Sequence, residues 1–161
     1  MINCRDITAR KQAELQLRQR EEIFRLAADA VDGVIFEWDV PSGRVERSRG
    51  LLELLGLHPD ALPGHVDAWR NRIHPPDLEA TLEKIAAALE SGRGWTTTYR
   101  IRDARNRYRL IFERALIQRN ADGQPLRAIG CAVDVTEVNR LTDLLAETQR
   151  ASKTGGWEYL H

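Results

Sequence analysis

The sequence predicts an α+β fold: a five-stranded antiparallel sheet with short helices on one face, flanked by an N-terminal and a C-terminal linker helix. Apolar periodicity gives the order helix, two strands, a cluster of short helices ending in one long helix, three strands, helix. A short signature also occurs twice, one domain length apart, as Asp6-Ile7-Thr8-Ala9-Arg10 and Asp134-Val135-Thr136-Glu137-Val138. This repetition indicates one complete module with parts of its neighbours attached.

The repeat sets the expected domain boundaries. A second echo pairs Gly155-Gly156-Trp157-Glu158-Tyr159 with the segment Gly33 to Trp38, so the start of another copy is expected at the end of the chain. We therefore expect the tail of a preceding repeat over 1–7, a linker helix over 8–31, the core domain over 32–136, an exit helix over 137–152 and the start of a following repeat over 153–161.

The first helix is predicted from a narrow apolar stripe. Its apolar residues recur mostly three, four or seven positions apart between charged residues, as in a coiled-coil seam: Ala9, Ala13, Leu17, Phe24, Ala27 and Val31. Arg20 interrupts the stripe, and Thr8 is the expected N-cap because its hydroxyl can accept a hydrogen bond from a first-turn amide.

The first half of the core alternates short strands and helices. Strands are expected over 34–40 and 44–48, because polar and apolar residues alternate around the turn Pro41-Ser42-Gly43. A short helix follows over 50–56 and a helical turn over 67–73. Pro75-Pro76-Asp77 then opens a longer helix that runs to about Glu90, since proline is tolerated in a first helical turn.

Three strands and the exit helix complete the chain. Strands are expected over 95–102, 108–119 and 125–135, with Leu110, Phe112 and Leu116 on one face of the middle strand and the turn Asn120 to Gly123 after it. From Thr136 to about Ala151 a second apolar stripe resumes, formed by Val138, Leu141, Leu145 and Thr148.

Composition narrows the class of protein. The 24 basic residues balance the 24 acidic ones, which argues against nucleic-acid binding. The two cysteines, Cys4 and Cys131, indicate neither a disulfide framework nor a cysteine zinc site. No apolar run approaches the roughly 18 residues of a membrane span, so a cytoplasmic segment is expected, whether or not the full-length protein is membrane-anchored.

In this arrangement the chain resembles the PAS domain, a sensory module repeated in many bacterial signalling proteins. The resemblance covers about residues 22–138. Its motifs are the opening strand and turn Phe36-Glu37-Trp38-Asp39-Val40 with Ser42-Gly43, the helix entry Ile73-His74-Pro75-Pro76-Asp77, the strand Tyr99-Arg100-Ile101-Arg102, and Gly130 followed by Asp134-Val135-Thr136-Glu137. Two departures are Arg105-Asn106 in place of the usual Asp-Gly turn, and Leu110 in place of a usual tryptophan.

The resemblance implies a central pocket but leaves its content open. Side chains of the core could line a ligand site or simply fill it: Phe36, Trp38, Leu55, Trp69, Tyr99, Leu110, Phe112 and Cys131. No haem or flavin motif is found, so no cofactor is predicted, although an unidentified small molecule remains an option. His74 is expected to cap or hydrogen-bond the helix entry rather than bind a metal. No metal site and no catalytic residues are expected.

Asp134 and Thr136 are the expected signal-coupling residues, because they join the last strand to the exit helix. The resemblance implies a homodimer through the flanking helices, with neighbouring PAS and output domains as partners and no nucleic acid or membrane contact in this segment. The output is expected to be a sensor histidine kinase of a two-component phosphorelay. The alternatives are a diguanylate cyclase or phosphodiesterase, or a ligand-free dimerisation spacer.

Overall fold

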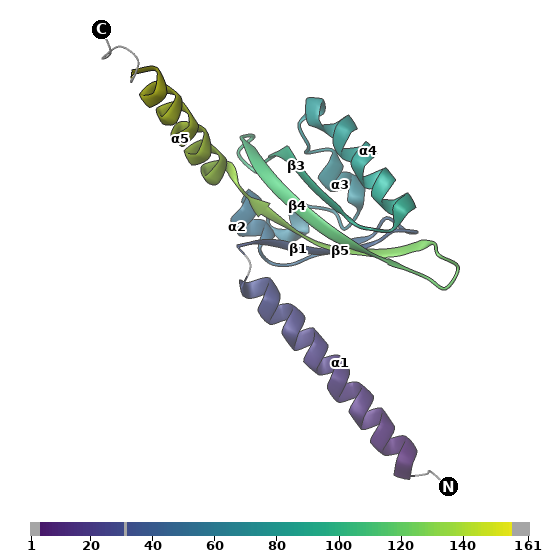
Figure 1. The fold of residues 1–161 in the computed structure, drawn as a ribbon. Coiled ribbons are helices and arrows are strands. Elements are labelled where there is room, and N and C mark those ends of the chain that lie inside the picture. Colours follow the sequence, from purple (N-terminus) through teal and green to yellow (C-terminus); the bar gives the residue numbers. More distant parts are fainter. Residues whose placement is uncertain (1–3, 31, 156–161) are drawn as a thin grey trace.

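A five-stranded sheet forms the centre of the molecule and two helices project from it (Figure 1). The computed structural model describes residues 4–30 and 32–155. Its elements are α1 (Cys4–Ala30), β1 (Gly33–Asp39), β2 (Val45–Arg47), α2 (Leu51–Leu55), the 3-10 helix η1 (Pro59–Ala61), α3 (Val66–Arg70), α4 (Pro75–Ser91), β3 (Trp95–Arg102), β4 (Tyr108–Arg119), β5 (Pro125–Asp134) and α5 (Thr136–Gly155).

The sheet has the strand order β2-β1-β5-β4-β3, and every neighbouring pair is antiparallel. The first strand of the chain therefore pairs with the last one: Phe36 of β1 lies opposite Gly130 of β5. Helices α2, α3 and α4 contribute side chains to the clusters on a single face of this sheet. The predicted α+β class with an antiparallel sheet is confirmed.

Local sequence explains the turns and close contacts of the sheet. Asn106 replaces the usual glycine in the β3–β4 turn at φ 60°, which asparagine tolerates better than most residues. At Gly130 a Cβ atom would lie 2.5 Å from the Arg114 carbonyl oxygen and 2.5 Å from Phe36. Only glycine lets β5 approach both neighbours here, so Gly130 permits the packing of Phe36 across the sheet.

The inner face of β4 differs from the prediction. Ile111, Glu113 and Ala115 are buried against the helices, whereas Leu116 is 65% exposed on the other side. Leu110 and Phe112 share that outer face because successive residues of a strand alternate between faces. Leu110, Phe112 and Leu116 do share one face, as predicted, but it is the outer face, so the expectation that Leu110 and Phe112 line the pocket is wrong.

Helices α1 and α5 leave the body of the domain in different directions and are not folded back over it (Figure 1). Helix α1 begins at Cys4, about one turn before the expected start, so Thr8 lies inside the helix and not at its N-cap. Of the further repeat expected over 153–161, residues 153–155 instead continue helix α5. Val31 and residues 156–161 lie outside the described residues. Among the described helices, none is long and apolar enough to cross a bilayer.

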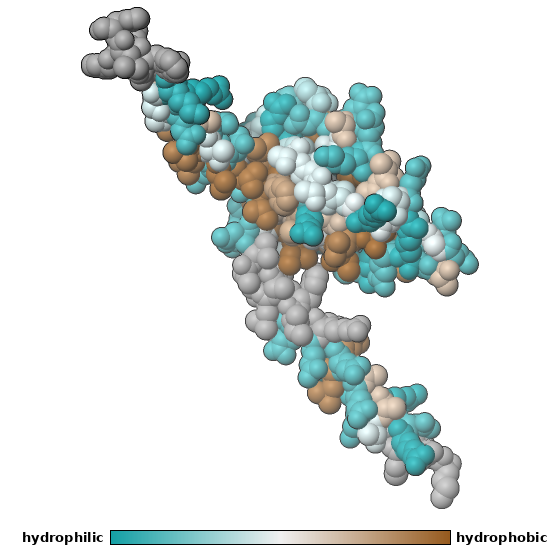
Figure 2. Space-filling view, viewed as in Figure 1, coloured by the Kyte–Doolittle hydropathy of each residue, from teal (hydrophilic) through white to brown (hydrophobic). Residues whose placement is uncertain are grey.

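The apolar stripe on α5 is exposed to solvent. Val138, Leu141, Leu144 and Leu145 are each about three-fifths exposed, at 64%, 63%, 59% and 64%. Figure 2 shows apolar side chains gathered along one side of this helix and continuing toward the sheet. On α1, Leu15 and Leu17 are likewise 58% and 59% exposed.

Candidate functional site

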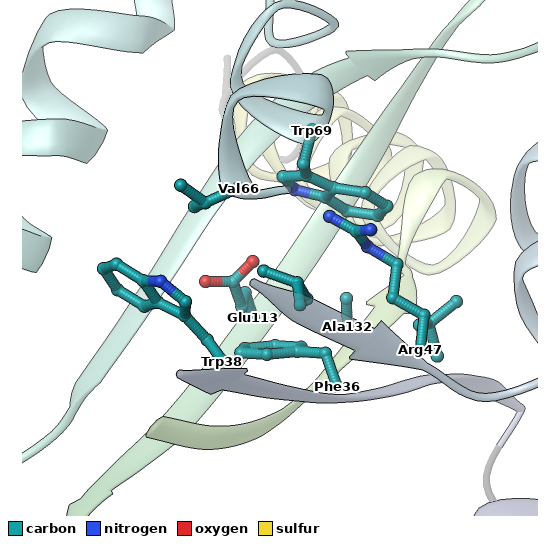
Figure 3. Close-up of a pocket in the computed structure, with 9 residues that line it drawn as sticks. Phe36, Trp38, Arg47, Val66, Trp69, Glu113 and Ala132 are labelled. Carbon is teal, nitrogen blue, oxygen red and sulfur yellow. The ribbon is translucent and has the colours of Figure 1, made fainter. Parts of the chain in front are cut away.

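A cavity of about 50 Å³ lies between the inner face of the sheet and α3 (Figure 3). One water needs roughly 10–15 Å³ measured in this way, so the space exceeds that of a single water. Strands β1 and β2 form one side, α3 covers another, and β4 and β5 form the floor. Most of the wall is apolar, and it also contains two indole rings, one basic side chain and one acidic side chain. The lining residues are Val34, Phe36, Trp38, Val45, Arg47, Val66, Trp69, Glu113 and Ala132.

Glu113 is a buried acid held by a chain of hydrogen bonds. The Trp95 indole donates to one carboxylate oxygen at 2.6 Å, and the Tyr99 hydroxyl donates to the other. The Trp69 indole in turn donates to the Tyr99 oxygen at 2.7 Å. Burial raises the pKa of Glu113 and raises that of Tyr99 well above its ordinary value. The network therefore supplies the hydrogen bonds that a buried carboxyl group needs, without which its burial would destabilise the fold.

Arg47 and Trp38 bring hydrogen-bond donors to the same cavity. The Arg47 guanidinium lies 5.6 Å from the centre of the Trp69 ring and makes a long hydrogen bond, 3.4 Å, to the Pro63 carbonyl. Burial lowers the pKa of Arg47. The Trp38 indole nitrogen is buried and has no hydrogen-bond partner among the described residues.

The predicted pocket residues divide into three groups. Phe36, Trp38 and Trp69 line the cavity. Leu55 and Tyr99 lie in the adjacent apolar core, where the Tyr99 hydroxyl reaches Glu113.

The remaining three predicted pocket residues do not line the cavity, so their assignment is wrong. Leu110 and Phe112 alternate with the buried face of β4, and Cys131 lies between Ile35 and Arg114 across the outer face of the sheet. Cys131 is a free, half-buried thiol there. Sequence reasoning missed Arg47 and Glu113 as pocket residues. The available signal for Glu113 was the alternation on β3. Thr97, Tyr99 and Ile101 are buried, and Glu113 lies directly opposite Thr97 on β4.

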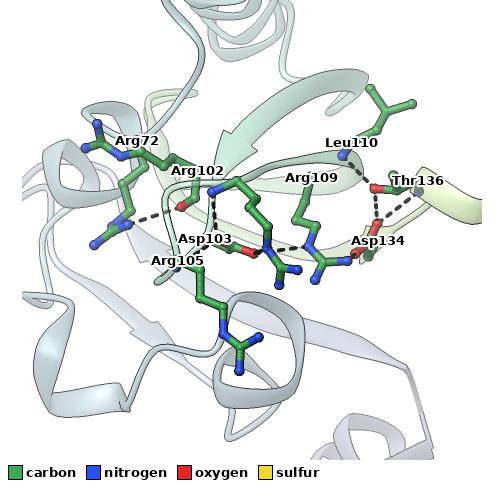
Figure 4. Close-up of polar contacts among 9 residues, drawn as sticks. Arg72, Arg102, Asp103, Arg105, Arg109, Leu110, Asp134 and Thr136 are labelled. Carbon is green, nitrogen blue, oxygen red and sulfur yellow. Dashed lines mark hydrogen bonds and ion pairs between the residues drawn. The ribbon is translucent and has the colours of Figure 1, made fainter.

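The joint between β5 and α5 is built from the two predicted coupling residues (Figure 4). The Asp134 carboxylate accepts hydrogen bonds from the Thr136 amide at 2.9 Å and from the Thr136 hydroxyl at 2.5 Å. The Thr136 oxygen also accepts the Leu110 amide of β4 at 2.9 Å. Asp134 therefore holds the first amide of the helix, while Thr136 ties that helix to the sheet.

A second acid, missed from the sequence, extends this joint. Asp103 is 3% exposed and accepts the Arg105 and Arg107 amides at 2.8 and 2.9 Å. Arg109 donates to Asp103 at 3.3 Å and lies 3.6 Å from Asp134. Burial acts to raise the pKa of Asp103, but the amide and arginine hydrogen bonds together hold it below its usual value. One arginine thus links the β3–β4 turn to the exit helix.

The described histidines lie apart from one another and have separate contacts. Within residues 4–30 and 32–155 no group of three or more potential metal ligands comes together. His65 caps α3 by accepting the Asp67 amide at 3.2 Å. His74 precedes α4 without making a side-chain cap, so that part of its expected role is wrong, and its ring instead packs edge-on against Tyr108 at 4.6 Å.

Comparison with known proteins agrees with this geometry. The family model described as the PAS fold matches residues 44–132. A sensory box histidine kinase/response regulator from Burkholderia thailandensis superposes with a TM-score of 0.68 at 26% identity, over 81% of this chain and 98% of the solved one.

Two curated relatives are signalling proteins. The two-component sensor PprA of Pseudomonas aeruginosa is 29% identical over 89% of this chain, and the probable diguanylate cyclase DgcE of Escherichia coli is 27% identical over 87% of it. The chain spans only 16% and 12% of the length of these two relatives. The sheet, the one-sided helices and the matched family model lead to the same conclusion: the chain belongs to the PAS family and has a signal-sensing role.

Proposed function

We propose that this domain couples the state of its sheet to an output domain through α5, within a sensor histidine kinase. The observation that carries the proposal is the joint at Asp134 and Thr136. There one hydroxyl is bonded both to the strand β4 and to the acid that holds the first turn of α5. A shift of β4 or β5 must therefore move the start of the helix or break these bonds.

Dimerisation through the flanking helices is the second part of the proposal. The exposed apolar residues of α5 recur at coiled-coil spacing, and such a seam is normally buried against a partner helix. A second copy supplies an identical stripe. A ligand or partner that favours one packing of this seam can bias an output domain by typically about 1–3 kcal/mol.

The kinase output rests on the relation to PprA and to the Burkholderia thailandensis structure. A diguanylate cyclase is the second candidate, because DgcE matches a similar share of the chain. Either output would use a cytoplasmic nucleotide substrate, so we expect this segment to be cytoplasmic.

The joint is tested in the intact protein with Asp134→Ala and with Asp143→Ala as the matched control. Asp143 lies exposed on α5, outside the joint, and accepts a 3.4 Å bond from Asn139. We expect the Asp134 variant to change autophosphorylation or cyclase activity and the control to leave it unaltered. Unchanged output from a folded Asp134→Ala protein would show that the joint is not the coupling element.

The dimer is tested by sedimentation of Leu141→Glu against Leu52→Glu. Both leucines are exposed, at 63% and 51%, but Leu52 lies on α2 and is not part of the α5 stripe. Only the Leu141 variant should shift the protein toward monomer. Native mass and an absorption spectrum of the purified protein then separate a ligand-loaded sensor from a ligand-free dimerisation spacer, since added mass or a visible band indicates a bound molecule.

A further inference from the structure

The wall of the cavity beneath α3 contains two hydrogen-bond donor groups that are unbonded or weakly bonded among the described residues. Its acceptor, Glu113, already receives one hydrogen bond on each oxygen from Trp95 and Tyr99. Of the other polar groups of the wall, Trp69 donates to Tyr99, whereas Trp38 and Arg47 have donors that these bonds do not use.

Trp38 is the clearest unmatched donor. The residue is 6% exposed, and its indole N–H, which can only donate, has no partner among the described residues. Figure 3 shows the nitrogen edge of this ring turned toward the middle of the pocket. A buried donor without a partner is costly, so a ligand that offers an acceptor here gains directly.

Arg47 is the second. Its guanidinium has five N–H groups, and the 3.4 Å bond to Pro63 engages one of them weakly. Within the described residues no carboxylate lies within 4.0 Å of it, while neighbouring Arg44 does have an ion pair, at 2.9 Å with Glu46. Arg47 also lies over Trp69 at the cavity wall, which fixes its direction. Glu113 acts on Arg47 only from beyond that contact distance, so a partly buried cation without a contacting anion favours an anionic ligand.

We propose that this cavity binds a small organic monocarboxylate. Its carboxylate accepts hydrogen bonds from Trp38 Nε1 and the Arg47 guanidinium, and its short apolar tail packs against Val34, Phe36 and Val66. The cavity volume limits the ligand to a few carbon atoms. The negative charge of Glu113 disfavours dianions such as phosphate. This inference rests on the proposed sensing function, and it specifies the class of molecule sensed.

Ligand binding at this site would act on the proposed joint through the sheet. Trp38 and Arg47 lie on β1 and β2, and β1 pairs along its whole length with β5, which ends at Asp134. A carboxylate that draws these two side chains together therefore acts on the strand that leads into α5.

The test is calorimetric titration of the full chain with acetate, propionate and butyrate, with propionamide as a neutral match and phosphate as a dianion. We expect saturable binding of a monocarboxylate, at least tenfold tighter than that of propionamide. Trp38→Phe, which keeps a ring but removes the N–H, should weaken binding on the order of tenfold. Arg47→Gln should weaken it more, and Arg44→Gln should not change it.

Glu113→Gln distinguishes the ligand class further. Removal of this negative charge should leave carboxylate affinity equal or higher, whereas it would weaken a ligand held by an ammonium group. The proposal is overturned if the folded protein binds no monocarboxylate, if propionamide or phosphate binds equally well, or if Trp38→Phe and Arg47→Gln both leave affinity unchanged. If binding fails while Asp134→Ala still alters output, the relay function stands without this ligand.

Discussion

Replacement of Thr136 by valine isolates the joint between sheet and exit helix, because valine has the same shape without the hydroxyl. The variant loses a 2.5 Å bond to the Asp134 carboxylate and leaves the half-buried Leu110 amide without its 2.9 Å acceptor. A bond to a charged group contributes about 1.5 kcal/mol, and an orphaned, partly buried amide costs about 1 kcal/mol. Solvent access lowers the sum to about 2 kcal/mol, acting locally at the start of α5.

Hydrogen exchange followed by NMR measures this loss where it should occur. About 2 kcal/mol corresponds to roughly thirtyfold faster exchange, since 1.4 kcal/mol is tenfold. We expect this acceleration at the amides of residues 110 and 136. Core strand amides such as that of Tyr99 should retain most of their protection, because local opening need not unfold the sheet.

Thr142→Val is the matched control on the same helix. Its hydroxyl donates only to the Val138 carbonyl, at 2.8 Å, and the residue is exposed. We expect less than about 0.5 kcal/mol from this change. Equal exchange in the two variants, or acceleration spread evenly over the sheet in Thr136→Val, would refute the assignment of the joint as a local and separable contact.

Two further predictions concern the acids that hold the core. Arg100 donates three hydrogen bonds to Asp77, each 2.9 Å, and its side chain holds the pKa of Asp77 at about 2. Because this pKa lies below that of the unfolded chain, the ion pair stabilises the fold above about pH 4, and this stabilisation is lost as pH falls toward 2. After allowance for solvent, Asp77→Asn should lower the free energy of unfolding in urea by about 1 kcal/mol at pH 7. A difference between the two proteins that persists at pH 2 would contradict this. Tyr99→Phe leaves Trp69 without its acceptor and Glu113 with one donor fewer, so we expect a loss of about 2 kcal/mol, and a loss below about 0.5 kcal/mol would contradict the buried network.

The sequence predicted the order of elements well but assigned β4 the wrong inner face. Leu110, Ile111 and Phe112 are three consecutive apolar residues, so alternation cannot decide which of them is buried. Glu113 made the true inner face look polar. Its burial depends on Trp95 and Tyr99, which donate from the neighbouring strand and are set by the β3–β4 register. When the hydrogen-bond partners of a buried polar residue lie on another strand, the sequence around that residue does not indicate that it is buried.

The joint could be predicted because its partners are two residues apart. Asp134 and Thr136 form a local pattern, whereas the Leu110 amide that completes it comes from another strand. Most partners of Asp103 are close in sequence, at Arg105 and Arg107, but its link to the joint was missed because Arg109 lies beside Asp134 only in the folded sheet. The start of α1 at Cys4 was also missed, because the repeat with residues 134–138 suggested a strand end at Asp6.

Insertion of alanines between Arg150 and Ala151 of α5 tests the relay most directly. Two residues rotate everything downstream by about 200°, while seven return it to within about 20° of its original phase. The output activity of the intact protein should be lost or reversed by the two-residue insertion and largely kept by the seven-residue one. Equal output from both insertions, in folded dimers, would show that the orientation of α5 carries no signal.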